Sequence, residues 1–208
     1  MPEPRELRSL VPAEVLAIIA IAIIPWPAPM PSALPLVIVA SISTYLRRRS
    51  WSERVSGGAM HVAIGGGAGL VALVVALVAG APFVEQISDR AVQWSVFPVV
   101  RGNAGQLAIV MVYVTVAAIA AELALRGWIV ERILELSPGA AVLPVVCGAL
   151  AEALVTPGEP VTRLGAACFG FGLGWIYVAS GRSVVAPICA RAVFQIGAVV
   201  LESLRVIG

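Results

Sequence analysis

The chain has 208 residues, of which 60% are hydrophobic and 12% are charged, with a net charge of +2 and a mean hydropathy of +0.97. Soluble domains carry about 25% charged residues, so this composition excludes an ordinary soluble domain. The net charge is too small to imply that the protein binds nucleic acid, and we expect no such partner. A chain of this length has room for roughly six to eight membrane spans of about 20 residues. We therefore expect an all-α polytopic transmembrane helix bundle of about seven spans.

Two apolar segments, Val11–Trp26 and Ala33–Leu46, open the chain, and a run of prolines between them ends the helical pattern. Each segment is short for a full span, so either could be tilted, partly interfacial or completed by flanking residues. The stretch 47–54 that follows holds four arginines. This density of positive charge predicts a cytoplasmic loop.

The third predicted span is Gly58–Gly80, and its closely spaced glycines would let a neighbouring helix approach. We expect a polar loop over Ala81–Asn103. The fourth predicted span, Ala104–Ala121, runs directly into two charged residues, Glu122 and Arg126.

The last three predicted spans complete the bundle. The fifth, Ala140–Val155, carries Glu152, and the seventh, Val184–Leu201, carries Arg191. The sixth, Leu164–Ala179, has small residues at four-residue spacing, which predicts a stripe for helix packing. The stripe consists of Ala166, Gly170 and Gly174.

Seven crossings with a cytoplasmic N-terminus would place most of the arginines on the inner side of the membrane, as the positive-inside rule requires. We predict two regions, with N-terminal transmembrane segments and a loop over 1–103 and a membrane core over 104–208. The chain is expected to be a multi-pass protein of a cell membrane.

Several kinds of active site are excluded by residue counts. The chain has one histidine, His61, so a zinc protease site of the HExxH type cannot form. It has one aspartate, Asp89, so an aspartyl dyad cannot form either. Three cysteines lie in apolar spans without a CxxC pattern. We expect neither a metal nor another cofactor.

The charged residues inside the apolar spans are the candidates for function. A charge at the centre of a membrane-spanning helix costs about 2.5–3.5 kcal/mol on insertion scales, so these side chains should point into the bundle. Glu122 and Arg126 are spaced i,i+4 and can pair on one helix face. Glu152 and Arg191 lie on different spans, and we predict an interhelical pair between them, which Gln195 could extend from the next turn.

Three segments, in order, resemble the motifs of the CPBP family of type II CAAX prenyl proteases and bacteriocin-processing membrane proteins. Ala117–Ile129 resembles the first motif, EExxxR followed by Gly. Val145–Leu154 resembles the second motif, FxxxH. Gly170–Gln195 resembles the third region, which has a Gly-rich helix, a Ser-Gly turn and a helix with HxxxN. The resemblance covers about 106–195.

The resemblance implies an intramembrane protease fold. In such proteins the first Glu and the second-motif His are thought to activate water, while the third-motif His and Asn stabilise the oxyanion. Here the four corresponding positions hold other residue types, namely Ala121, Glu152, Arg191 and Gln195. Glu122 and Arg126 match the family, where they can be interpreted as support for the site geometry. The five candidate site residues are therefore Glu122, Arg126, Glu152, Arg191 and Gln195.

We favour a protein that has lost the family's catalytic set and works by binding, as an accessory or scaffold subunit of a membrane complex or a chaperone for a membrane client. Its expected partners are the lipid bilayer and another membrane protein subunit, with no nucleic acid. One alternative is an active CAAX-type endopeptidase that uses Glu152 as base with Arg191 and Gln195 as oxyanion donors. Another is a small-solute or ion carrier that uses the buried charges as a relay. We expect the membrane to be a bacterial plasma membrane.

Overall fold

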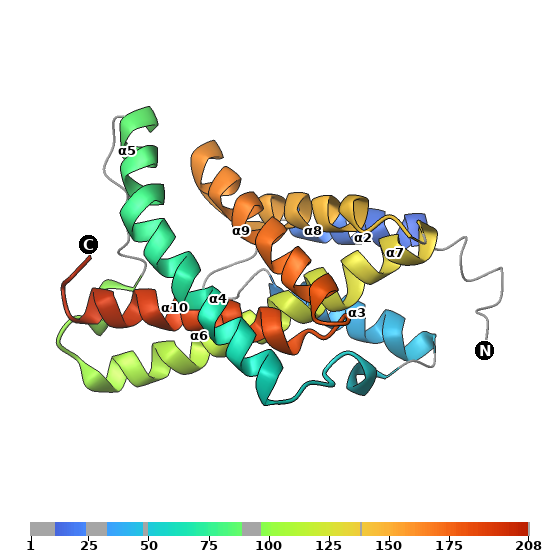
Figure 1. Cartoon of the computed structure of the whole chain (residues 1–208), viewed down its shortest axis with the longest axis horizontal. Helices are drawn as coiled ribbons and strands as arrows, with labels where there is room; N and C mark the ends of the chain where they lie inside the picture. The colour runs from blue at the N-terminus through green and yellow to red at the C-terminus, as the bar shows by residue number, and fades with distance from the viewer. Residues whose placement is uncertain (1–10, 24–32, 48–49, 89–96, 138, 208) are drawn as a thin grey trace. The chain divides into compact units, whose positions relative to one another are not determined.

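A computed structural model describes residues 11–23, 33–47, 50–88, 97–137 and 139–207. These residues are mainly helical, with no strand among them (Figure 1). All seven apolar segments predicted from the sequence are helical over their described parts, apart from one or two residues at the start of three of them. The prediction of an all-helical membrane bundle is confirmed.

Helix length and composition identify the strongest candidates for membrane spans. Among the described residues, four continuous helices are long and apolar enough to cross a bilayer. They are Ala59–Ile87, Ala104–Leu136, Pro160–Ala179 and Val185–Ser203. Two shorter apolar helices, Leu34–Leu46 and Val142–Val155, match the second and fifth predicted segments. The protein is therefore a multi-pass membrane protein.

The third helix is longer than predicted. α4 (Ala59–Val75) continues through a π-helical turn, η2 (Ala76–Gly80), into α5 (Ala81–Ser88). The predicted loop over Ala81–Asn103 is therefore wrong for Ala81–Ser88, which is helical. Pro82 ordinarily ends a helix because it lacks an N–H and its ring clashes with a carbonyl one turn earlier. The π turn directly before it widens the hydrogen-bond spacing, with the Ala81 N–H bonded to Ala76 O.

The chain forms two compact units, and each is built from two separate stretches. Unit 1 comprises Met1–Ser56 and Ala120–Val184, and unit 2 comprises Gly57–Ile119 and Val185–Gly208. Each unit therefore takes residues from both sides of the predicted boundary at 103/104. That boundary stays a prediction.

Unit 1 has its apolar core where the second apolar helix meets the end of the fourth. Its elements are α2 (Val11–Ile23), α3 (Ala33–Leu46), η1 (Trp51–Glu53), the end of α6 (Ala104–Ala124), η4 (Leu125–Val130), α7 (Glu131–Leu136), α8 (Val142–Val155) and α9 (Pro160–Ala179). Leu36 and Ala40 of α3 pack with Leu125 and Trp128 of η4, and all four are buried. The indole Nε1 of Trp128 also donates to Ser43 Oγ at 3.2 Å.

The predicted stripe of small residues on α9 lies against α8, and α9 runs at an angle to α8 in Figure 1. A Cβ added at Gly174 would lie 2.9 Å from Val145 Cγ1. One added at Gly170 would lie 3.0 Å from Glu152 Cβ. The absence of both side chains lets the α8 and α9 backbones approach closely, as the spacing predicted.

Unit 2 is held by a second glycine contact. Its elements are α4, η2, α5, η3 (Pro98–Val100), the first part of α6 and α10 (Val185–Ser203). Gly65 and Gly69 of α4 face the backbone carbonyls of Ala186 and Ala190 on α10, where an added Cβ would clash. The two glycines form a GxxxG pair, whereas Gly66 between them has no non-local atom within 4 Å.

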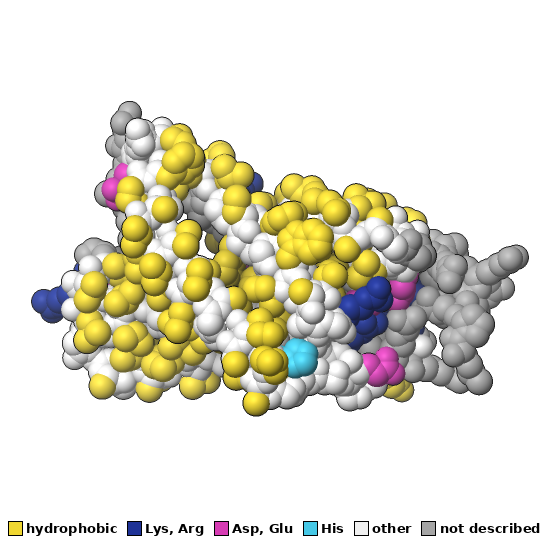
Figure 2. Space-filling view, viewed as in Figure 1, with side chains coloured by type: hydrophobic (Ala, Val, Ile, Leu, Met, Phe, Trp, Pro, Cys, Tyr) yellow, Lys and Arg dark blue, Asp and Glu magenta, His cyan; other side chains and the backbone are white. Residues whose placement is uncertain are grey.

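Many large apolar side chains are exposed on the helices, as expected of helices that contact lipid. Apolar side chains dominate the face drawn in Figure 2, and charged side chains occupy only small patches on it. Large hydrophobic residues such as Val71 and Val78 are well exposed on α4 and η2, and Ile109 and Val112 are exposed on α6. These positions are the natural lipid-facing surface of the spans.

Candidate functional site

The site begins at a change of helix type in the fourth span. α6 ends at Ala124 and continues as the π-helical segment η4, whose first residues include Arg126. All six residues of η4 are buried. Short π segments inside α-helices are frequent at functional sites because the i→i+5 spacing changes which side chains share a face. Here the segment sets the direction of the guanidinium at membrane depth.

Arg126 joins two carboxylates from different helices. Its Nη1 donates to Glu122 Oε1 at 3.1 Å and to Glu152 Oε2 at 2.7 Å. Arg126 and Glu122 are fully buried, and Glu152 is 4% exposed. The predicted i,i+4 pair of Glu122 and Arg126 is confirmed. The contact of Arg126 with Glu152 was not predicted, because its partners are 26 residues apart on separate helices.

A third helix completes this charged triad of Glu122, Arg126 and Glu152. Arg126 Nη2 donates to the backbone oxygen of Gly170 on α9 at 2.7 Å. A Cβ at Gly170 would lie 3.2 Å from that Nη2 and 3.0 Å from Glu152 Cβ. Glycine at this position therefore leaves room for both the ion pair and the carbonyl contact. The guanidinium of Arg126 on η4 therefore binds one residue each from α6, α8 and α9.

The remaining candidate residues lie on α10, in unit 2. Arg191 is buried, with 7% of its surface exposed, and Gln195 follows one turn later. The formal charges of the triad sum to −1, and the predicted pairing of Glu152 with Arg191 would balance this charge. That pairing would involve both units and stays a prediction.

Ala121 occupies the position where the family pattern has its first glutamate. It packs against the apolar cluster of unit 1 that contains Ala124 and Leu125. A methyl group in this place contributes to packing and cannot take or release a proton. This position of the motif is therefore used for packing.

A second buried cluster lies five residues after Arg126. Tyr177 Oη donates to Glu131 Oε1 at 2.6 Å, and Arg54 Nη1 lies 2.6 Å from Glu131 Oε2. Glu131 is 3% exposed, and this cluster was not predicted. In an α-helix a residue at i+5 faces away from residue i, but the i→i+5 bonding of a π segment brings the two closer to one face. The sequence feature that could have predicted this cluster is the charged residue Glu131 within the amphipathic stretch after Arg126.

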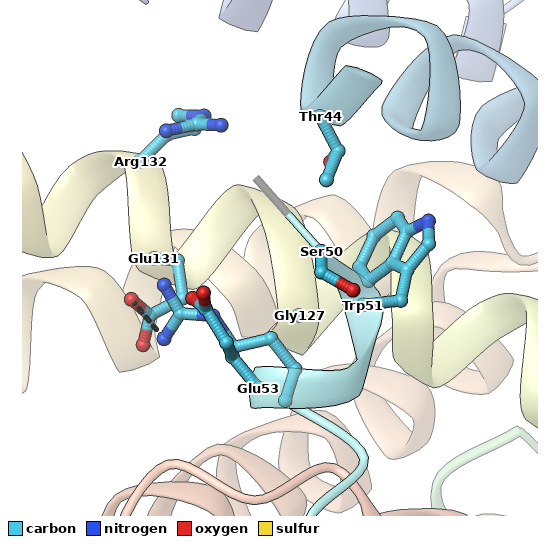
Figure 3. Close-up of a pocket in the computed structure, with 8 residues that line it drawn as sticks. Thr44, Ser50, Trp51, Glu53, Gly127, Glu131 and Arg132 are labelled. Atoms are coloured by element: carbon cyan, nitrogen blue, oxygen red, sulfur yellow. Dashed lines mark ion pairs between the residues drawn. The ribbon is translucent and has the colours of Figure 1, made fainter. Parts of the chain in front are cut away.

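A small pocket opens beside this second cluster (Figure 3). Its lining residues are Thr44, Ser50, Trp51, Glu53, Arg54, Gly127, Glu131 and Arg132. The cavity volume is about 10 Å³, close to the smallest space that holds one water molecule. A peptide substrate would not fit there. Among the described residues, no group of three or more His, Cys, Asp or Glu side chains is placed to hold a metal ion.

Comparison with known families found a match to the second half of the chain. Residues 103–197 match the family described as type II CAAX prenyl endopeptidase Rce1-like. This segment is Rce1-like. The resemblance to the CPBP family expected from the motifs is confirmed. No curated protein and no solved structure matched the chain.

The Rce1-like segment contains every residue of the charged triad and both α10 candidates. Within unit 1 the Rce1-like segment places a carboxylate, Glu152, at the second-motif position and binds it to Arg126. This arrangement can hold the helices together. In it the Glu152 carboxylate is already bound by the Arg126 guanidinium.

Proposed function

We propose that this protein is a non-catalytic member of its membrane protease family that acts by binding another membrane protein, as an accessory or scaffold subunit or a chaperone for a membrane client. The observation that carries the proposal is the engagement of Glu152 by Arg126 at 2.7 Å in a buried setting. In this role the triad stabilises the packing of the helices in unit 1.

A general base needs a carboxylate that can reach water and accept its proton. A carboxylate that is hydrogen-bonded to a guanidinium is stabilised in its ionised form and is a weak base. Ala121 supplies no second acid–base group at the neighbouring motif position. Loss of a general base or an oxyanion donor typically lowers the rate by about 10²–10⁴-fold, and here both kinds of group are replaced.

The direct test is a cleavage assay on the purified full-length chain in mild detergent. Prenylated CAAX-type peptides and transmembrane peptides would be incubated with the chain, with an active family protease as positive control. We expect no cleavage above the background without protein. A second assay would measure uptake of small solutes and ions into liposomes that contain the chain, and there too we expect no activity.

Cleavage by the chain that disappears in Glu152→Gln would refute the proposal and establish the rewired glutamate protease. Glu85→Gln provides the matched control, because it makes the same chemical change at an exposed position of α5. Solute uptake that depends on Glu122 or Glu152 would instead establish a carrier.

The binding role has its own test. Full-length chain purified from its native membrane in mild detergent should carry one other membrane protein at a fixed stoichiometry, measured by native mass spectrometry. Recovery as a lone chain under conditions that keep known membrane complexes intact would contradict an accessory role.

We further propose that the membrane is a bacterial plasma membrane and that the N-terminus lies in the cytoplasm. The arginine-rich stretch after α3 supports the orientation, because positively charged loops face the cytoplasm. Reporter fusions made after Leu46 and after Leu136 should both report the cytoplasmic side. A periplasmic signal at either position would reject this topology.

A further inference from the structure

We propose that unit 1 thins the bilayer around it, to a hydrocarbon layer of about 21–24 Å where a typical one measures about 30 Å. The partner of this surface is therefore the lipid of the membrane itself. The lengths of three helices in unit 1 and the exposure of their ends carry the inference, which does not depend on the binding role proposed above.

The apolar helices of unit 1 are short. α3 and α8 have 14 residues each, and at 1.5 Å per residue each is about 21 Å long. α9 has 20 residues, but Arg163 near its start is exposed. The apolar part that follows, Leu164–Ala179, is about 24 Å long. Each apolar length therefore falls short of a typical hydrocarbon core by about 6–9 Å.

Apolar side chains that face outward follow two of these helices from end to end. Leu143 and Leu154 are well exposed near opposite ends of α8. Leu164 and Trp175 are exposed in the same way on α9, with the same separation along the chain. Such residues lie close to one helix face, because three turns of an α-helix hold about 11 residues. Each helix thus presents one lipid-facing side along its whole length.

The ends of α8 and α9 show where the hydrocarbon layer must stop. The loop between the two helices exposes residues 157–159, which include the charged Glu159. At the opposite ends, residues 139–140 before α8 and 181–182 after α9 are exposed and are not helical. Irregular backbone does not face lipid within the hydrocarbon region, because its N–H and C=O groups would lack partners there. Both ends of each helix must therefore reach headgroups or water.

Tilt and snorkelling do not resolve the shortfall of α8. Tilt only reduces the thickness that a helix of given length crosses, and it suits the longer α9, which runs at an angle to α8 in Figure 1. Snorkelling needs a long basic side chain at the helix end. Arg132 before α8 is buried and bonded to Glu135, and no arginine or lysine lies between Val155 and Glu159. A thinner hydrocarbon layer is the response that remains for lipid in contact with α8.

Unit 2 provides a reference within the same chain. Its α4, η2 and α5 form one continuous apolar helix, Ala59–Ile87, of 29 residues. At 1.5 Å per residue this helix is about 44 Å long, which exceeds a typical hydrocarbon core. A helix that is too long fits by tilting, so this one requires no thinning of the bilayer.

The test measures the depth of nitroxide labels in the full-length chain, with Cys147, Cys168 and Cys189 replaced by alanine. The chain is reconstituted into bilayers of phosphatidylcholine with 18-carbon chains. Leu143→Cys and Leu154→Cys are labelled one at a time. The accessibility of each label to oxygen and to a water-soluble nickel complex gives its depth below the headgroups. The two positions are at most about 17 Å apart across the membrane.

The two depths on α8 should add up to about 4–7 Å, because their sum and the separation together give the local thickness. In an undisturbed layer of about 30 Å the sum would be at least about 13 Å. Ile64→Cys and Val75→Cys on α4 are the matched control, because these positions are also exposed and have the same separation. Their depths should add up to at least about 13 Å.

Leu164→Cys and Trp175→Cys repeat the measurement on α9, where the sum should again be smaller than on α4. This second pair keeps the test decisive if a variant of α8 does not fold. A sum in unit 1 that equals or exceeds the sum on α4 would overturn the proposal. Labels in unit 1 that neither reagent reaches would show that another protein helix covers this face, and would also overturn it.

Discussion

The two units of this protein join their helices by different means. In unit 1, Arg126 binds Glu122 and Glu152 and also a backbone oxygen of α9, so charged groups connect the end of α6, η4, α8 and α9. In unit 2, α4 contacts the backbone of α10 at Gly65 and Gly69, which have no side chain. Both units use glycine for close approach, since Gly170 and Gly174 do the same between α8 and α9. The difference is that a buried guanidinium also joins the helices of unit 1, whereas the α4–α10 contact is made at glycines.

That difference has a physical consequence for specificity. Glycine contacts gain dispersion energy with any helix of suitable shape. A buried guanidinium needs acceptors at defined positions, and leaving it without them is strongly unfavourable. The charged triad of unit 1 should therefore tolerate few changes, whereas the α4–α10 contact of unit 2 should be sensitive to changes in side-chain volume. Four predictions test this comparison, from the largest effect to the smallest.

The largest loss should follow Arg126→Met. The variant would leave Glu122 and Glu152 buried without their shared guanidinium, at a cost of about 3–5 kcal/mol in free energy of unfolding. The measurement is reversible unfolding in mild detergent, followed by tryptophan fluorescence. Arg163→Met on α9 is the control, because Arg163 is exposed in the same unit. Equal stability of the two variants would show that the triad does not brace unit 1.

The second prediction concerns neighbouring glycines on one helix. Gly69→Ala should destabilise the protein by about 1–3 kcal/mol, because the new methyl group meets the Ala190 carbonyl. Gly66→Ala should instead be neutral or stabilising by up to about 1 kcal/mol, because alanine favours a helix and nothing non-local lies near that position. Thermal unfolding of the two glycine variants measures both changes in stability. Changes of the same sign would argue against the α4–α10 contact.

The third prediction sharpens the comparison by asking whether a charge pair links α8 to α10. Arg191→Ala should destabilise the protein, and adding Glu152→Ala should recover part of that loss. A coupling free energy of at least about 0.5 kcal/mol in the double-mutant cycle would establish the pair. Strictly additive effects would reject it and leave Arg126 as the principal partner of Glu152.

The smallest effect is expected for Tyr177→Phe, which removes one of the donors to Glu131. The Arg54 ion pair remains, so the loss should be about 1 kcal/mol. The change is measured by the same detergent unfolding, with Tyr45→Phe at an exposed position of α3 as the matched control. A loss as large as that of Arg126→Met would mean that the second cluster, rather than the triad, carries the stability of unit 1.

Local periodicity explains which parts of the site were predictable. Glu122 and Arg126 are one helical turn apart, so their pairing follows from the spacing alone. The small-residue stripe on α9 was likewise visible, because helix geometry places residues four apart on one face. The extension of the third helix through Pro82 was not, since it depends on a π turn that residue type does not specify.

Composition and helical period by themselves determined that this is an all-helical membrane protein, where its apolar segments lie, and which charges must point away from lipid. They did not determine which helix each charge meets. The binding of Glu152 by Arg126, and of Glu131 by Arg54 and Tyr177, joins residues from 26 to 77 positions apart. Such contacts depend on how each helix is rotated and how closely the backbones approach, and a single π segment changes that rotation. The tertiary structure alone therefore decided that the second-motif carboxylate is engaged.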